Sequence, residues 1–357
     1  MAILVMRSIV WAFAREPFQR LPFQAKGGGS SAARSKMAAD AGVSQKPSIP
    51  KALWDAFDLC VNLRGIGWSW SPIRNLRPEA SQSRVNFLCK GAARIVFYAF
   101  AVDVATGAVH AIVPVTAGRG TILDANLPFP KRLFLAAVAA CIFILHLYSA
   151  FELVYSVSSF CSVSVLGQDP MQWPPIFNQP WLSTSLGEFW GKRWHQQFRD
   201  CFSSLGSRSS IAFSENLRSI QAPVGSNRVK GDGERRSSKN LPRVLGAFFI
   251  SGVFHDMGCR LLGNKDSVRI IGFFMVQAVG VILERAVARS SAPSLGSTCS
   301  PGLKTFLGRI WVALWLLVWG IHFVDAWTQA GLFAVPIFPE PLRPLRIVQV
   351  VWDNIFR

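Results

Sequence analysis

Residues 184–200, TSLGEFWGKRWHQQFRD, form the stretch that decides the fold. Ser185 is a residue type that caps helices, and Glu188 follows three positions later, which is the spacing of a capping box. Four apolar residues then recur at every fourth position: Leu186, Trp190, Trp194 and Phe198. This period predicts one amphipathic helix that lies on an apolar layer.

His195 lies between the apolar face of this predicted helix and a polar face that carries Lys192 and Arg199. A side chain at that boundary can extend into a binding site beside the helix, while the tryptophans hold the helix at the interface between an apolar layer and water. Under the alternative interpretation, His195 is a surface residue of an interfacial helix.

The composition points to a membrane protein. Hydrophobic residues make up 50% of the 357 residues and charged residues only 16%, so the apolar surface exceeds what one soluble core needs. The formal net charge of +18 gathers in a few loops between long apolar runs, which fits a positive-inside topology better than nucleic-acid binding. We therefore expect an all-α, polytopic transmembrane protein in contact with the lipid bilayer, and no nucleic-acid partner.

Charge and hydrophobicity divide the chain into regions. Residues 1–50 combine a short apolar start with a basic segment rich in Gly and Ser that we expect to be disordered. Residues 51–357 are expected to form a membrane-embedded domain, in which the Ser-rich, basic residues 203–243 predict a disordered loop. Because cations favour the cytoplasmic side, this loop and the helix at 184–200 are expected to face the cytosol.

The apolar runs predict the membrane spans. One helix is expected over residues 92–116, and another from residue 133 to about 149, followed by a separate or re-entrant segment. Three more apolar runs lie at 244–258, 268–283 and 306–327. Asp103 and His110 interrupt the first span, either as functional groups on one helix face or because the helix ends near Asp103.

The cysteines give no sign of a metal site or of a disulfide framework. The seven are spread along the chain without pairs at metal-binding spacing: Cys60, Cys89, Cys141, Cys161, Cys201, Cys259 and Cys299. We interpret them as reduced packing residues and expect no bound metal.

A second histidine lies in the apolar run at residues 244–258, VLGAFFISGVFHDMG. Ala247, Ser251 and His255 recur at a spacing of four, and the small residues leave room beside the histidine for a ligand or another backbone. An imidazole kept neutral by an apolar site can accept a proton, so His195 and His255 together suggest acid–base chemistry. The alternative is that His255 is a packed helix residue bonded to a neighbour.

Several of these segments resemble the wax synthase-like branch of the membrane-bound O-acyltransferases. They are LGEFWGKRWHQ at 186–196 with the preceding WPPIFNQPWLSTS at 173–185, and SGVFHD at 251–256. RGIGW at 64–68 is similar to a motif of fungal members. The resemblance covers about half of the chain, from residue 55 to residue 258.

The resemblance implies a polytopic enzyme of the endoplasmic reticulum membrane that transfers an acyl group from acyl-CoA, as co-substrate, to a hydroxyl, with no bound cofactor. His255 would be the catalytic base and His195 the second polar residue of the site. Four residues would contact the substrate: Trp190, Arg193, Trp194 and Ser251. Lys192 and Arg199 are expected to contact the CoA phosphates.

The RGIGW motif favours transfer of an acetyl group from acetyl-CoA to a lipophilic alcohol such as a terpenoid. A long-chain wax or sterol ester synthase is the alternative enzyme. The alternative of another class is a non-catalytic transporter or scaffold, with a polar pathway through Asp103, Glu152 and Asp325. Family members have spans before the RGIGW segment, where this chain has one short apolar run, so we expect a truncated amino terminus or a reduced scaffold.

Overall fold

The computed structural model describes the backbone at residues 2–12, 18–20, 49–62, 64–71, 83–113, 120–199, 201–206, 232–263, 266–290, 300–334 and 337–356. Within these residues the protein is built from helices without a strand, which confirms the expected all-α class. A short first helix, α1 (Ala2–Ala12), and α3 (Ile49–Val61) precede the long helices. The expected disordered segment falls mostly at residues 21–48, outside the described residues.

Five of the described helices are long and apolar enough to cross a membrane. They are α4 (Arg84–Ile112), α5 (Phe129–Ser164), α8 (Asp232–Leu261), α9 (Ser267–Ser290) and α10 (Pro301–Ala330). A helix of about 20 apolar residues spans the hydrocarbon layer of a bilayer. The chain is therefore a multi-pass membrane protein, as its composition predicts.

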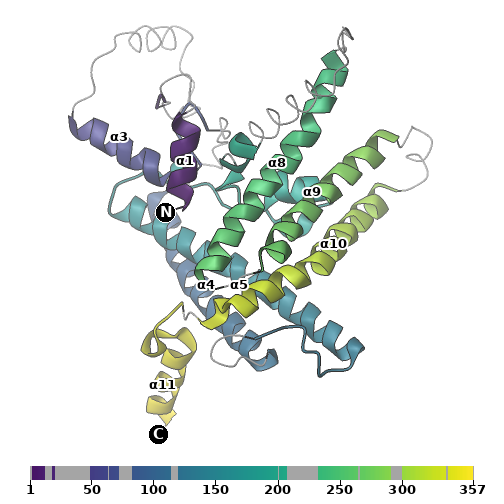
Figure 1. Cartoon of the computed structure of the whole chain (residues 1–357). Coiled ribbons are helices and arrows are strands. Elements are labelled where there is room, and N and C mark those ends of the chain that lie inside the picture. Colours follow the sequence, from purple (N-terminus) through teal and green to yellow (C-terminus); the bar gives the residue numbers. More distant parts are fainter. Residues whose placement is uncertain are drawn as a thin grey trace, which may run out of the picture.

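The long helices form two groups that meet at α5. Helix α5 contacts α4 on one side and α10 on the other, while α8 and α10 both contact α9. Figure 1 shows α8, α9 and α10 fanned out beside one another, with the α4–α5 pair crossing near their lower ends. Apolar side chains of these helices form the main core, including Phe143, Cys259, Ile270, Phe274 and Val324.

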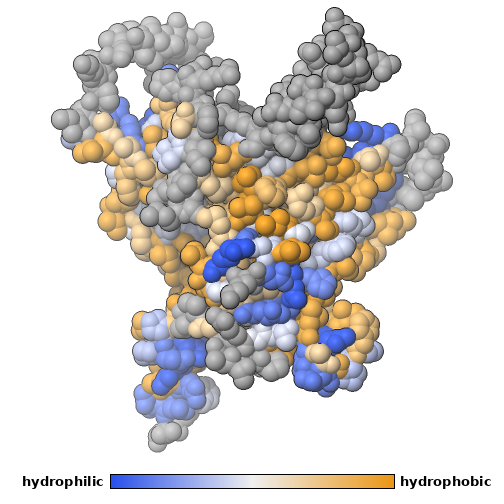
Figure 2. Space-filling model, viewed as in Figure 1, coloured by the Kyte–Doolittle hydropathy of each residue, from blue (hydrophilic) through white to orange (hydrophobic). Residues whose placement is uncertain are grey.

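The outer surface of the helices is apolar. Large hydrophobic side chains are exposed on every spanning helix, for example Phe97, Leu145, Phe249, Leu283 and Val318. Figure 2 shows this hydrophobic surface over much of the helices, with hydrophilic patches at the lower end, including around the C-terminal helix α11 (Pro344–Phe356), near the centre of the view and at the upper right. Such a surface suits lipid rather than water.

Helix α5 is one continuous helix of 36 residues, so the expected break near residue 149 is wrong. No glycine occurs in it, and its only proline is Pro130, in the first turn, where proline is tolerated. Glu152 does not force an exit from the membrane because it is buried within the protein and not in lipid.

Both ends of the predicted disordered loop at 203–243 are helical instead. Residues 201–206 are helical and α8 already begins at Asp232, whereas residues 207–231 lie outside the described residues. Pro242 is accommodated inside α8. The polar composition of 232–243 suggests a loop, but these residues extend the apolar helix that follows them.

The acidic residues of the spans hold helices together. The Asp103 carboxylate accepts hydrogen bonds from Arg343 (2.9 Å) and from the backbone N–H of Leu345 (3.0 Å), which attaches the start of α11 to the middle of α4. Helix α4 continues to Ile112, so it does not end at Asp103. The Nε2 atom of His110 lies 3.2 Å from the Phe333 carbonyl.

Asp325 on α10 is 1% exposed and has a complete set of donors. It accepts hydrogen bonds from Thr121 (2.6 Å), the backbone N–H of Ile122 (3.0 Å), Arg269 (2.8 Å) and Gln329 (2.7 Å). One carboxylate thereby joins α9, α10 and the segment before α5. A buried carboxylate that is fully paired in this way stabilises packing.

We expect Asp325→Ala to lower the stability of the detergent-solubilised protein by on the order of 3 kcal/mol, because it leaves several donors without their acceptor. The measurement is the midpoint of thermal unfolding. Asp266→Ala is the matched control, since Asp266 pairs with the same Arg269 at 2.9 Å but is exposed. Its change should be below about 1 kcal/mol, and equal shifts for both variants would contradict this role of Asp325.

Candidate active site

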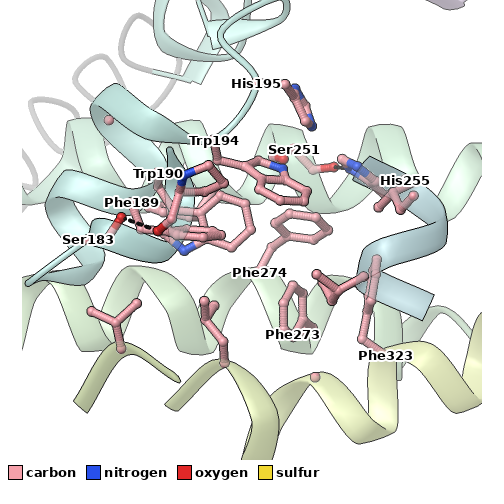
Figure 3. A pocket seen from close by; sticks show the side chains of 18 of the residues that line it. Ser183, Phe189, Trp190, Trp194, His195, Ser251, His255, Phe273, Phe274 and Phe323 are labelled. Carbon is pink, nitrogen blue, oxygen red and sulfur yellow. Dashed lines mark hydrogen bonds between the residues drawn. The ribbon is translucent and has the colours of Figure 1, made fainter. Parts of the chain in front are cut away.

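Both histidines singled out in the sequence line one large cavity. Its volume is about 1240 Å³, and its walls come from α5, α8, α9, α10 and the segment 180–203. Figure 3 shows His195 and His255 near each other at one side of this cavity, with the rings of Trp190, Trp194 and Phe274 beside them. The two imidazoles are 60 positions apart in the sequence, and only the packing of α8 against the 184–199 segment brings them together.

The segment that carries His195 is not the continuous helix that its period predicts. The Ser185 hydroxyl accepts a hydrogen bond from the Glu188 N–H (3.0 Å), so the predicted cap is present. Helix α6 (Leu186–Glu188) then passes into the π-helical turn η3 (Phe189–Arg193). The N–H of Trp194 bonds to the carbonyl of Phe189 (2.8 Å), and Trp194 itself is extended.

The π-helical turn explains why the expected helix is wrong. A π turn inserts an extra residue into the helical repeat, so the fourfold spacing no longer keeps all apolar residues on one face. Trp190 and Trp194 both reach the cavity, as expected, and the indole N–H of Trp190 lies 3.4 Å from Gln277 Oε1 on α9. The segment leaves the helix at Trp194, which is extended, and His195 follows outside any helix.

A carboxylate of α9 fixes the start of this segment. Glu284 accepts hydrogen bonds from the backbone N–H groups of Leu186 (2.6 Å) and Gly187 (3.1 Å), and from the Trp311 indole (2.8 Å). The first N–H groups of a helix have no acceptor within the helix. Here a side chain of another helix supplies that acceptor. At Gly280 on α9, a Cβ atom would lie 2.5 Å from Leu186, so glycine permits this close approach.

His255 has a defined proton position. Its Nδ1 atom lies 2.7 Å from the Ser251 carbonyl oxygen, one turn earlier on α8. Because a carbonyl oxygen only accepts hydrogen bonds, Nδ1 carries the proton and Nε2 carries the lone pair. The ring packs against Phe274 with centroids 4.4 Å apart, and Ser251 itself also lines the cavity.

His195 is held by aromatic rings. It stacks on Phe151 of α5 with centroids 4.9 Å apart, and it contacts Trp194 (5.6 Å) and Phe198 (5.7 Å). Its Nδ1 atom is buried and has no hydrogen-bond partner among the described residues. Burial, and to a lesser extent the nearby His255, lowers the pKa of His195 to about 3, so the ring is neutral at pH 7.

Two residues expected to contact ligands lie outside the cavity wall. Arg193 donates to Glu188 (2.7 Å) and to the Asn178 carbonyl (3.1 Å), and Lys192 is exposed. The π turn directs both cations away from the cavity, so Arg193 ties its own segment together instead of shaping the pocket. Arg199, by contrast, lines the cavity.

Sequence reasoning missed three further arginines of the cavity wall. Arg243 on α8, Arg285 on α9 and Arg309 on α10 join Arg199, and all four are exposed. Among the described residues, no Asp or Glu lines this cavity. Each of these three arginines lies near the end of an apolar run, where charged residues are common in membrane helices. The sequence therefore gives no sign that they line the same cavity.

Known proteins share this site-bearing part of the chain. The model of the membrane bound O-acyl transferase family matches residues 173–276, which include His195 and His255. Acetyltransferase eriL of Hericium erinaceus is 26% identical over 261 residues, 71% of this chain and 60% of that protein. Acetyltransferase ple2 of Rhodocybe pseudopiperita is 24% identical over 297 residues, 81% of this chain and 69% of that protein.

A plant protein with a different kind of name is also similar to the chain. Probable long-chain-alcohol O-fatty-acyltransferase 8 of Arabidopsis thaliana is 28% identical over 164 residues, 45% of this chain and 42% of that protein. No solved structure matches the chain. The chain thus spans about 60% of the length of eriL, and the family match at residues 173–276 includes both histidines. Residues 173–276 thus match the membrane bound O-acyl transferase family, and the chain is similar to proteins named as fungal acetyltransferases and as a plant long-chain-alcohol O-fatty-acyltransferase.

Proposed function

We propose that the protein transfers an acyl group from acyl-CoA to the hydroxyl of a lipophilic alcohol. The observation that carries this proposal is the single cavity, apolar over most of its wall, in which two imidazoles of different segments lie near each other. His255 is the general base and His195 is the second polar group of the reaction centre. The family match over the same residues supports this assignment.

The proton position of His255 suits a base. Its Nε2 lone pair takes the proton of the alcohol while the alcohol oxygen attacks the thioester carbonyl carbon. The carbon–sulfur bond then breaks, and the imidazolium returns the proton to the sulfur, which leaves as free CoA. No acyl-enzyme is needed. The Ser251 carbonyl holds the ring in one tautomer throughout.

His195 stabilises the charge that forms on the thioester oxygen. It is neutral at pH 7, so it acts as a hydrogen-bond donor and adds no second positive charge beside His255. Its stacking on Phe151 fixes the direction of the ring. A donor that is already oriented in an apolar site stabilises a developing oxyanion most effectively.

The four cavity arginines are the proposed site of the CoA phosphates, in place of the expected Lys192. Guanidinium groups suit phosphate, and the lining residues that the structure describes include no carboxylate to compete for them. Arg243 and His255 are twelve positions apart on α8, which is about 18 Å along a helix. The pantetheine arm of CoA, comparable to about five extended residues or roughly 17 Å, covers that depth.

The acceptor is proposed to arrive from the bilayer. Ile144, Leu145 and Trp181 line the cavity and are also exposed on the apolar outer surface. A lipophilic alcohol, such as a terpenoid, can therefore reach the cavity without crossing water. The endoplasmic reticulum is the proposed membrane.

A short acyl group is proposed to bind beside the aromatic rings at His255. Phe274 and Phe323 contact the His255 ring and line the cavity, and they are only 3% and 9% exposed, so they are packed side chains that bound this part of the wall. The names of the fungal relatives agree with acetyl transfer. Transfer of a long acyl chain is the second candidate, favoured by the name of the Arabidopsis relative.

We expect His255→Ala to lower transfer at least about 100-fold, because the alcohol loses its proton acceptor. The measurement is product formation by mass spectrometry in membranes of a host without related enzymes. Acetyl-CoA and palmitoyl-CoA are each offered with a terpenoid alcohol and with a fatty alcohol. His195→Ala should also slow transfer, by about 10- to 1000-fold.

His322→Ala is the matched control, because His322 is an exposed histidine of α10 that does not line the cavity. It should leave turnover near the wild-type rate. Undiminished turnover by His255→Ala would overturn the assignment of the base. Preference for palmitoyl-CoA with the fatty alcohol would replace acetyl transfer by the second candidate.

We expect the double variant Arg285→Ala/Arg309→Ala to raise KM for acyl-CoA at least about tenfold with a smaller change in kcat, because the phosphate contacts bind ground state and transition state alike. Raising the ionic strength should weaken binding of acyl-CoA to the wild type more than to this variant. Lys192→Ala, an exposed cation outside the cavity wall, is the control and should leave KM unchanged. An unchanged KM in the double variant would contradict the phosphate site.

A further inference from the structure

The RGIGW motif at residues 64–68 is remote from both histidines in sequence and contributes nothing to the cavity wall. We propose that Arg64 of this motif is a positioning residue, which holds the elbow at residues 173–178 and thereby sets the place of His195. This inference rests on the proposed function, because it assigns the motif a part in the same reaction. It does not depend on which acyl group or acceptor is used.

Arg64 reaches the elbow directly. It is 8% exposed, and its guanidinium donates to the carbonyls of Pro174 and Pro175, the second at 2.9 Å. The Tyr155 hydroxyl on α5 donates to the same Pro174 carbonyl (2.6 Å), and the guanidinium lies over the Tyr155 ring. The planar Arg64 guanidinium thus binds two successive carbonyls of an irregular segment and holds that segment beside α5. A lysine has one terminal nitrogen and binds two carbonyls at once less well.

The motif is built to hold that arginine in place. Gly65 has φ +61°, and a Cβ atom there would lie 2.6 Å from the Trp70 ring, so the turn requires glycine. Asn62 bonds to both the N–H and the carbonyl of Ile66, at 3.1 and 2.9 Å. The Ser71 hydroxyl donates to the Arg64 carbonyl (2.9 Å). Backbone and side chain of Arg64 are therefore both fixed.

The elbow at residues 173–178 in turn contacts the segment that carries His195. Directly after the two prolines, Ile176 is buried and Phe177 packs against Trp194, with centroids 5.0 Å apart. Asn178 then joins the π turn twice. Its N–H donates to the Arg193 carbonyl (2.9 Å), and the Arg193 guanidinium donates to its carbonyl (3.1 Å).

The path therefore runs from Arg64 through the prolines and Asn178 to Arg193, two residues before His195. Each contact in it is a hydrogen bond or a ring contact, and Asn178 itself is exposed. A displacement of about 1 Å at a reacting group can cost roughly 100-fold in rate. Loosening the elbow should therefore reduce catalysis through His195 without touching the arginines of the cavity.

The test is a double-mutant cycle of Arg64→Lys with His195→Ala. We expect Arg64→Lys alone to lower kcat by about 10- to 100-fold with KM for acyl-CoA nearly unchanged. In the His195→Ala background the same change should cost less than about twofold, because the group that it positions is gone. Arg20→Lys is the matched control, since Arg20 pairs with Asp55 and Asp58 beside the same motif and does not touch the elbow.

Hydrogen exchange supplies a readout that needs no activity. The amides of Asn178 and Trp194 should exchange faster in Arg64→Lys than in the wild type, and not in Arg20→Lys. Tyr155→Phe removes only the hydroxyl bond to Pro174 and should show the same pattern with smaller changes, which covers the case that Arg64→Lys does not fold.

Equal losses of kcat in both backgrounds, or unchanged exchange at Asn178 and Trp194, would overturn the role of Arg64. Absence of transfer by the wild type with every donor and acceptor would instead remove the proposed function. In that case the exchange measurement still decides whether Arg64 holds the elbow.

Discussion

The structure depends on satisfying the backbone polar groups of an irregular segment that packs among apolar helices. Residues 165–199 contain only short helical turns, so many of their N–H and C=O groups find no partner within a regular helix. Distant side chains supply those partners. Glu284 of α9 accepts from the amides of Leu186 and Gly187, and Arg64 donates to the carbonyls of the two elbow prolines. Irregular backbone is tolerated among membrane helices only under such conditions.

This constraint also explains why the charged residues of the helices lie where they do. Glu284, Asp325 and Asp103 each accept two or more hydrogen bonds from other segments. None of them lines the cavity. The acidic groups of the spans thus hold the scaffold together, while the cavity keeps apolar walls, two imidazoles and a cationic opening. A buried charge costs little when every lone pair is used, and separating these charges from the cavity leaves the histidines in an apolar surrounding.

The two histidines illustrate how the local setting of each ring determines what it can do. His255 sits on a regular helix, and the carbonyl one turn earlier fixes its tautomer. His195 follows a π turn and the extended residue Trp194, where aromatic rings fix its plane and leave Nδ1 without a partner among the described residues. The proposed roles of the two rings, one as proton acceptor and one as hydrogen-bond donor, rest on this difference in local setting.

The sequence by itself determined the helical membrane class, the cap at Ser185 and the two histidines, because hydropathy, capping and residue type are local properties. Only the tertiary structure decided the uninterrupted course of α5, the π turn after Glu188 and the presence of four arginines in one cavity wall. It also placed Arg193 and Lys192 outside that wall, against the expectation from the family resemblance. The physical reason is that periodicity assumes a constant number of residues per turn. Contacts from Glu284 and Arg64, about 100 positions away, decide where that assumption fails.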